Sequence, residues 1–415
     1  AMASAMALTL FASCAPIGSN DTGNNNGGNA GAEKVFRFAT STEPTSLDPQ
    51  LGSGTWITNV TGAIFEGLVR RYNGEIEPAI AETWDVSNDG LTYTFHLRDV
   101  AWSDGTPITA QDFVDSWNLL IERATPMAQH TEYFTVDGKA NARAIDEKTL
   151  EVTLNYKVPF IMEVFAMSAM AVVRVDKYDE KGDAYYQTIP ETMNGPFLLV
   201  DWQPNNVMVL EPNPDYWNAE RVNFDRVEIY TVTEDTTQVN MYRNGEIDML
   251  DVPETMYKDF EDEGMIYYED GANFYIQFTT DGQTDETAKY LANRNFIEAV
   301  SACIDREDFV NSVYNGSFEP TVEFVPGSAT GYNGGTKADA NVTISSPFMI
   351  KADLTVAQEK LDAALEELGT TADAMPTFTL VVSDATDRQT AAQYIQDVCG
   401  QIGIQIEIDT IPSAT

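Results

Sequence analysis

A strand, a helix and a second strand follow one another near the end of the chain. Residues 378–384 (FTLVVSD) and 402–409 (IGIQIEID) are rich in β-branched residues and predict two strands. The stretch from Ala391 to Gly400 lies between them and has helical periodicity. Because this β-α-β order limits how the elements can pack, the last third of the chain is expected to be α/β.

Strands and helices also alternate in the rest of the chain. Apolar and polar residues alternate in residues 91–98 (LTYTFHLR) and 149–154 (TLEVTL), which predicts two half-buried strands. Thr109 followed by Asp112 predicts the capped start of one helix, and a second helix is expected from Thr355 to Gly369. With 415 residues, of which 43% are hydrophobic, the chain can form two or three packed units.

Acidic side chains outnumber basic ones, 65 to 24, which gives a formal net charge of −41. Such a chain repels nucleic acid and anionic membrane surfaces, so neither is an expected partner. The charge is consistent with a solvated surface that keeps a secreted protein soluble. A preference for cationic ligands is the alternative interpretation.

Three cysteines, Cys14, Cys303 and Cys399, are too few for a disulfide framework and lack metal-ligand spacing. Cys303 and Cys399 lie on apolar stretches with helical periodicity, so each is expected to be a small buried apolar residue. A bridge between the two remains an open alternative.

The first fourteen residues (AMASAMALTLFASC) form a short apolar run that ends in small residues and Cys14. This pattern is similar to a bacterial lipoprotein signal, in which Cys14 would be lipidated. Phe11 stands where Leu is usual, no basic segment precedes the run, and the missing initial Met suggests an earlier true start. The alternative is a frayed apolar N-terminus.

Residues 15–33 are rich in Gly and Asn and are expected to form a flexible tether. The segment 328–345 is expected to be a long exposed loop. No later segment has the length and apolarity of a transmembrane helix. The sequence therefore predicts a soluble extracytoplasmic body, held to the outer face of the cell membrane or in the periplasm by one lipid anchor.

The residues that catalysis requires are not arranged in any recognisable motif. His96 and His130 are the two histidines, and they lie in a predicted strand and a predicted loop. No phosphate-binding loop, nucleophile elbow or zinc-protease motif is present. We expect no catalytic residue, no metal and no cofactor, and hence a protein that is not an enzyme.

Nine segments in a fixed order resemble one known family. They are SLDP (46–49), FEGLVR (65–70), PAIAETWDVSNDGLTYTFHLR (78–98), WSDGTPITAQDFVDSW (102–117), TLEVTL (149–154), NGPFLLVDW (194–202), NPDYWN (213–218), YRNGEID (242–248) and CIDRE (303–307). Together they resemble the family 5 extracellular solute-binding proteins, which are the oligopeptide- and dipeptide-binding lipoproteins of bacterial ABC importers.

The resemblance implies an α/β, bilobed fold like that of type II, cluster C periplasmic binding proteins, with an inserted middle domain. By analogy, lobe I comprises residues 34–65 and 175–271, the insert 66–174, and lobe II 272–415. In the family the chain continues beyond this point and returns to lobe I, so we expect the C-terminal part, with its amine-binding Asp, to lie beyond Thr415.

The resemblance also implies ligand-binding residues. The backbone of Ser53, Gly54 and Thr55 resembles an extended stretch that pairs with a bound peptide. Met127 of the insert stands where peptide binders often have Tyr, which puts that contact in doubt. Asn273, Phe274 and Tyr275 match an aromatic strand that faces the ligand.

The function implied is that of a monomeric binding protein, which captures a short peptide between two lobes and delivers it to the membrane permease. Family relatives also bind nickel complexes, haem, glutathione or oligosaccharides, so a non-peptide ligand is the first alternative. A secreted hydrolase is the remote one.

Overall fold

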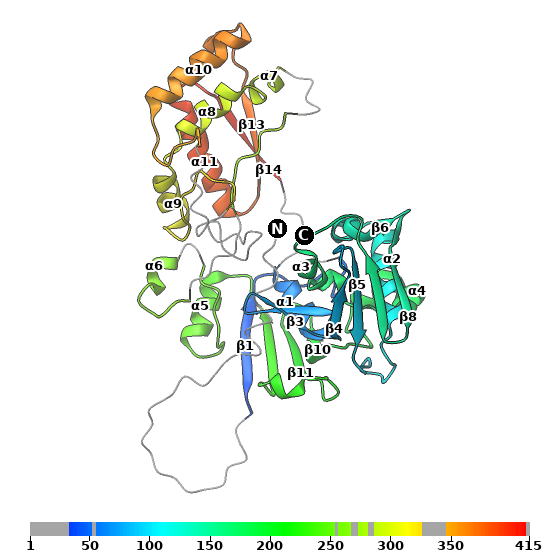
Figure 1. The fold of residues 1–415 in the computed structure, drawn as a ribbon. Coiled ribbons are helices and arrows are strands. Elements are labelled where there is room, and N and C mark those ends of the chain that lie inside the picture. The colour runs from blue at the N-terminus through cyan, green and yellow to red at the C-terminus, as the bar shows by residue number, and fades with distance from the viewer. Residues whose placement is uncertain are drawn as a thin grey trace. The chain divides into compact units, whose positions relative to one another are not determined.

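A computed structural model describes residues 33–51, 55–253, 256–266, 273–280, 286–325 and 346–411. The chain divides into an N-terminal unit that ends at Asp251 and a C-terminal unit that begins at Val252 (Figure 1). Cys14, most of the predicted tether and the predicted loop at 328–345 lie outside the described residues. The division into lobes and an insert stays a prediction.

The N-terminal unit contains two four-stranded sheets. The first has the order β1-β12-β11-β10, in which β1 and β12 are parallel and the other pairs are antiparallel. Its strands are β1 (Val35–Thr40), β10 (Phe197–Gln203), β11 (Val207–Pro212) and β12 (Arg226–Thr231). The second is antiparallel, with the order β4-β5-β9-β8. Its strands are β4 (Ala81–Val86), β5 (Thr92–Leu97), β8 (Ala142–Asp146) and β9 (Thr149–Thr153).

Short hairpins and helices complete this unit. The hairpins are β2 (Val69–Tyr72) with β3 (Glu75–Pro78) and β6 (Thr135–Val136) with β7 (Lys139–Ala140). The α-helices are α1 (Thr55–Ile64), α2 (Ala110–Arg123), α3 (Ile161–Phe165), α4 (Val175–Lys181) and α5 (Asp235–Arg243). The 3₁₀ helices are η2 (Pro126–Phe134), η3 (Ser168–Met170), η4 (Gly182–Tyr186) and η5 (Ala219–Arg221).

The two strands predicted from alternating polarity are confirmed as β5 and β9. They pair with each other, and Phe95 lies opposite Leu150 with both side chains fully buried. The predicted start of α2 is also confirmed, because the Asp112 carboxylate accepts hydrogen bonds from the backbone N–H and the hydroxyl of Thr109. This cap orients α2 so that Phe113 and Trp117 enter the core.

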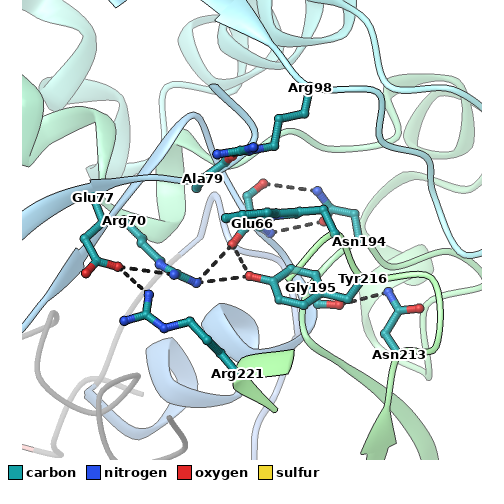
Figure 2. A network of polar contacts seen from close by, with 11 residues as sticks. Glu66, Arg70, Glu77, Ala79, Arg98, Asn194, Gly195, Asn213, Tyr216 and Arg221 are labelled. Carbon is teal, nitrogen blue, oxygen red and sulfur yellow. Dashed lines mark hydrogen bonds and ion pairs between the residues drawn. The ribbon is translucent and has the colours of Figure 1, made fainter. Parts of the chain in front are cut away.

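Three of the nine segments that resemble the family, 65–70, 194–202 and 213–218, meet around the buried Glu66 (Figure 2). Its carboxylate accepts hydrogen bonds from the Tyr216 hydroxyl at 2.5 Å and the Trp217 indole N–H at 2.6 Å. Burial raises the pKa of Glu66, and these hydrogen bonds and the Arg70 charge oppose that rise. The Asn194 amide both accepts from the backbone N–H of Glu66 and donates to its carbonyl, so segments far apart in sequence are held together.

Gly195, the residue after Asn194, lies too close to the backbone of α1 for any side chain. A Cβ atom at this position would lie 2.5 Å from the carbonyl oxygen of Ala63. No side chain fits there without moving the end of α1, so the close approach of the two backbones depends on this glycine.

The C-terminal unit has a two-stranded parallel sheet, β13 (Phe378–Ser383) with β14 (Ile406–Ile411). Its helices are α6 (Tyr257–Phe260), α7 (Ala288–Leu291), α8 (Arg294–Ala302), α9 (Arg306–Tyr314), α10 (Leu354–Leu368), η7 (Ala372–Ala374) and α11 (Thr386–Gly400). The predicted β-α-β order is confirmed as β13-α11-β14. Its core includes Tyr290, Phe296, Leu361 and Phe378.

Two helix boundaries differ from the sequence expectation. The helix expected at Thr355 begins at Leu354, because the Asp353 side chain accepts hydrogen bonds from two backbone N–H groups and caps it. It ends at Gly369 as predicted, with a left-handed φ of 63°. Helix α11 begins at Thr386, earlier than predicted, because its polar first turn hides the periodicity. Among the described residues, no helix has both the length and the apolarity needed to cross a membrane.

Candidate functional site

The turn at residues 48–51 is fixed to the end of α2 by a buried ion pair. Asp48 is 1% exposed, and its Oδ2 lies 2.7 Å from Nη1 of Arg123. Its Oδ1 accepts a 2.8 Å hydrogen bond from the backbone N–H of Gln50. Burial raises the pKa of Asp48, while the Arg123 charge and the Gln50 hydrogen bond oppose the rise. The Asp48 side chain therefore fixes this part of the chain to α2.

Gln50 lies within this turn and holds it against α2 and Thr125. It is fully buried, and its Nε2 donates to the carbonyl of Ser116 in α2 at 2.7 Å. Its own carbonyl accepts a 2.8 Å hydrogen bond from the Thr125 hydroxyl. The chain therefore enters the predicted ligand segment from a position fixed on both sides.

A hollow of about 510 Å³ adjoins this anchor. It lies between the C-terminal end of α2 and η2, and Thr125 belongs both to its wall and to the Gln50 contact. The lining combines apolar and polar residues, with Glu132 as its one charged side chain; it consists of Ile121, Ala124, Thr125, Ala128, Gln129, Thr131, Glu132 and Thr135.

The predicted ligand residues of the N-terminal unit have different outcomes. Ser53 and Gly54 lie outside the described residues. Thr55 is the first residue of α1, so the expectation of extended backbone is wrong at this position, because the helical hydrogen bonds begin there. Met127 lies in η2 and packs partly buried against the main core. Ligand contact by these residues stays a prediction.

In the C-terminal unit, Asn273 and Tyr275 lie against residues 323–324. The Asn273 side chain donates to the carbonyl oxygens of Glu323, at 3.3 Å, and of Phe324. The centroids of the Tyr275 and Phe324 rings lie 5.6 Å apart. Tyr275 is 64% exposed, so these contacts position the residue and leave much of its ring accessible.

Phe274 belongs to a neighbouring aromatic cluster. Its ring centroid lies 5.2 Å from that of Phe318 and 6.2 Å from that of Tyr314, and Phe274 is 52% exposed. The guanidinium carbon of Arg388 lies 4.1 Å from the Phe274 ring centroid, and Nη1 of Arg388 donates to the Tyr314 hydroxyl at 3.3 Å. This cation–π contact holds one face of a half-exposed ring.

Residues 273–280 are assigned no strand, so the expectation of an aromatic strand is wrong for the described structure. No described segment forms a β-ladder with them, and side-chain contacts position them instead. Sequence reasoning did not identify Gln50 or Arg388. Arg388 follows the carboxyl end of β13, where ligands of α/β folds commonly bind, so its position was a usable signal. Gln50 offered none.

The described ranges contain no group of three His, Cys, Asp or Glu side chains placed to hold a metal ion. His96 lies on the half-exposed side of β5, where its Nε2 is 3.0 Å from Asp85 Oδ2. His130 lies in η2 rather than in a loop, and burial lowers its pKa.

Residues 75–415 match the family described as bacterial extracellular solute-binding proteins, family 5 Middle. The chain is 27% identical over 396 residues to the oligopeptide-binding protein OppA of Bacillus subtilis, covering 89% of this chain and 69% of that protein. It is 37% identical over 223 residues to the periplasmic oligopeptide-binding protein OppA of Escherichia coli, covering 50% of this chain and 41% of that protein.

Among solved structures, the murein tripeptide binding protein MppA of Escherichia coli matches with a TM-score of 0.76 at 25% identity. The match covers 92% of this chain and 76% of that one. The similarity confirms the expected α/β fold of a bilobed periplasmic binding protein.

Proposed function

The chain belongs to the bacterial extracellular solute-binding proteins of family 5, and from that membership we propose that it captures short peptides for the membrane permease of an ABC importer. The observation that carries the proposal is the similarity to an oligopeptide-binding protein over 89% of this chain. The function is binding, without cleavage of the bound peptide.

The N-terminal unit contributes a main-chain contact in this proposal. The backbone of residues 53–55 pairs with the peptide main chain, which gives affinity without reading the peptide sequence. The Asp48–Arg123 pair and the buried Gln50 support this role, because they fix the chain immediately before the segment. A segment fixed before binding loses less conformational entropy when the ligand arrives.

The C-terminal unit contributes aromatic surface. Phe274 and Tyr275 are each more than half exposed, and each is positioned by a neighbouring ring. Rings that are already positioned can cover peptide side chains of many kinds at low entropic cost. Asn273 keeps the segment against residues 323–324.

The protein acts outside the cytoplasm, as its extracellular family implies. We further propose that Cys14 carries the lipid that holds it to the membrane, that it works as a monomer, and that residues 34–65 with 175–271, 66–174 and 272–415 form lobe I, the insert and lobe II. Nucleic acid is not a partner.

Calorimetry with tripeptide to pentapeptide libraries tests the proposal on protein expressed from its complete gene. We expect saturable binding that depends weakly on peptide sequence, and mass spectrometry should recover the peptides intact. Native mass spectrometry of the purified protein should also reveal a retained ligand. Absent binding, or the appearance of cleaved peptides, would contradict the proposal.

A further inference from the structure

The hollow between α2 and η2 offers apolar and polar contacts side by side. Its volume of about 510 Å³ lies within the range of roughly 300–1,000 Å³ that small-molecule sites occupy. Ile121, Ala124 and Ala128 supply apolar surface, on which a chain of methylene groups can lie. The hollow therefore suits a side chain that has an alkyl stem and a polar end.

The three threonine hydroxyls of the lining all use their protons within the N-terminal unit. Thr125 donates to the carbonyl of Gln50 at 2.8 Å, and Thr131 donates to the carbonyl of Ala128 at 2.7 Å. Thr135 donates to the carbonyl of Thr131 at 2.8 Å. Because a hydroxyl has one proton, these groups can offer only acceptor lone pairs to a molecule in the hollow. The lining thus favours a ligand whose polar end donates hydrogen bonds.

Glu132 adds a negative charge to these acceptors. It is exposed, and in the described part of the chain its carboxylate forms no ion pair. His130 is a neighbouring basic group, but burial lowers its pKa, so the imidazole is uncharged at neutral pH and does not compensate Glu132. An ionised carboxylate only accepts hydrogen bonds, whereas ammonium and guanidinium groups only donate them. The hollow therefore matches the charged end of a lysine or arginine side chain.

The hollow also lies beside the backbone that is proposed to bind the peptide. The hydrogen bond from Thr125 to Gln50 joins its wall to the turn at residues 48–51. Only Gly52 separates that turn from Ser53 in the sequence. A peptide whose main chain pairs with residues 53–55 would pass close to the hollow, and the side chains of an extended peptide project alternately to either side.

We propose that the hollow receives a lysine or arginine side chain of the bound peptide and that Glu132 selects it. The inference rests on the proposed capture of peptides, and it adds a preference that main-chain pairing alone does not give. The alkyl stem lies on Ile121 and the two alanines, and the charged end donates to Glu132 and to the threonine hydroxyls.

Calorimetry with tripeptides that carry either lysine or norleucine tests this role of Glu132 in protein expressed from its complete gene. Norleucine keeps the alkyl stem of lysine and lacks its charge, and the peptide pairs place the residue at each position in turn. At one or more positions, lysine should bind roughly three- to tenfold more tightly than norleucine. Glu132→Gln should abolish this preference and leave the affinity for norleucine peptides unchanged.

Glu122→Gln is the matched control. Glu122 is also exposed and lies in α2, but it does not belong to the lining of the hollow. This variant removes the same charge and should keep the preference for lysine. A preference that is missing in the wild type, or that survives in Glu132→Gln, would overturn the inference, while binding of the norleucine peptides would still support the proposed function.

A second probe tests the hollow even if no tripeptide binds, a result that would contradict the proposed function. The n-butylammonium ion is the end of a lysine side chain without its main chain, and 1-butanol is its uncharged counterpart. In ligand-detected NMR, n-butylammonium should bind the wild type and Glu122→Gln more tightly than it binds Glu132→Gln, and 1-butanol should not distinguish the three proteins. Equal binding of n-butylammonium to all three would show that Glu132 does not make the hollow a cation site.

Discussion

The carboxylate of Asp48 and the guanidinium of Arg123 meet at 2.7 Å with 1% and 10% of their side chains exposed. Few water molecules can reach either group, so the Asp48 charge depends on Arg123 for compensation. Arg123 also contacts Asp183 at 3.0 Å and lies over the Tyr178 ring at 4.5 Å. The pair therefore joins the turn at residues 48–51 and α2 to α4 and η4.

Replacing Arg123 tests that dependence. Arg123→Met leaves the Asp48 carboxylate buried without its partner, so the free energy of unfolding should fall by about 3–5 kcal/mol. Urea denaturation at neutral pH measures this change. Arg143→Met is the matched control, since Arg143 also lies 2.7 Å from a carboxylate, that of Glu151, but is 69% exposed. Its unfolding should be unchanged within error, because water screens that pair. Equal losses in the two variants would refute the argument from burial.

A second prediction concerns the pH dependence of stability at Asp104. Partial burial raises the pKa of this carboxyl, but hydrogen bonds from Thr106 and Arg174 outweigh it and hold the pKa at about 2. A carboxyl whose pKa is lower in the folded state contributes stability above its unfolded pKa, and that contribution is lost as the pH falls through the folded value. Asp104→Asn should therefore destabilise the protein at pH 7, and its difference from the wild type should shrink as the pH falls toward and below 2.

The free energy of unfolding of wild type and variant, measured from pH 7 to pH 2, separates the effect of the Asp104 charge from the effect of packing. Asp99→Asn is the control, because the fully exposed Asp99 contacts Lys148 at 3.4 Å in the same loop region. This variant should resemble the wild type at every pH. A stability difference for Asp104→Asn that is as large at pH 2 as at pH 7 would assign its effect to packing and not to charge.

Local signals in the sequence predicted where helices and strands lie. They did not predict the contacts between residues far apart in the chain. Thr109 with Asp112 predicted the start of α2, and β-branched runs predicted β13 and β14, since each signal involves neighbouring residues. The anchor of Asp48 could not be predicted in this way. Its partner Arg123 lies at the end of a helix far along the chain, and their mutual compensation exists only after folding excludes water.

A third prediction separates ligand contact from packing in the C-terminal unit. Phe274→Ala and Tyr275→Ala should weaken peptide binding by roughly 1–2 kcal/mol each and change the melting temperature little, because both rings are more than half exposed. Calorimetry gives the affinity and thermal denaturation the stability. Phe296→Ala is the contrasting control, since this 1% exposed ring should cost about 3–5 kcal/mol of folding free energy. Unaltered affinity in both ligand variants would remove residues 274–275 from the site.

A fourth prediction concerns the membrane anchor. Expressed with its complete signal in a bacterial host, the protein should carry acyl chains on Cys14, since this residue ends the apolar run. Cys14→Ser should release the protein from the membrane fraction or leave its signal uncut. Mass spectrometry of the mature N-terminus gives the answer, and an unmodified Cys14 in membrane-bound protein would rule the anchor out.

A fifth prediction uses Thr55, where the structure changes how a proline should act. Because Thr55 is the first residue of α1, its N–H has no partner within the helix, and proline is well tolerated there. Thr55→Pro should therefore fold with nearly the stability of the wild type. If the backbone pairs with the peptide, loss of this donor should weaken binding by about 1–3 kcal/mol.

Thr55→Pro thus tests a hydrogen bond from the Thr55 backbone to the ligand, and two further variants show whether α1 is damaged. Thr55→Ala keeps the N–H and should bind within a few-fold of the wild type, whereas Thr61→Pro, inside α1, should cost about 3 kcal/mol or more of stability. Comparing the three variants by calorimetry and thermal denaturation separates helix damage from a lost donor. If Thr55→Pro retains both stability and affinity, this backbone does not pair with the ligand, and the main-chain contact must lie elsewhere.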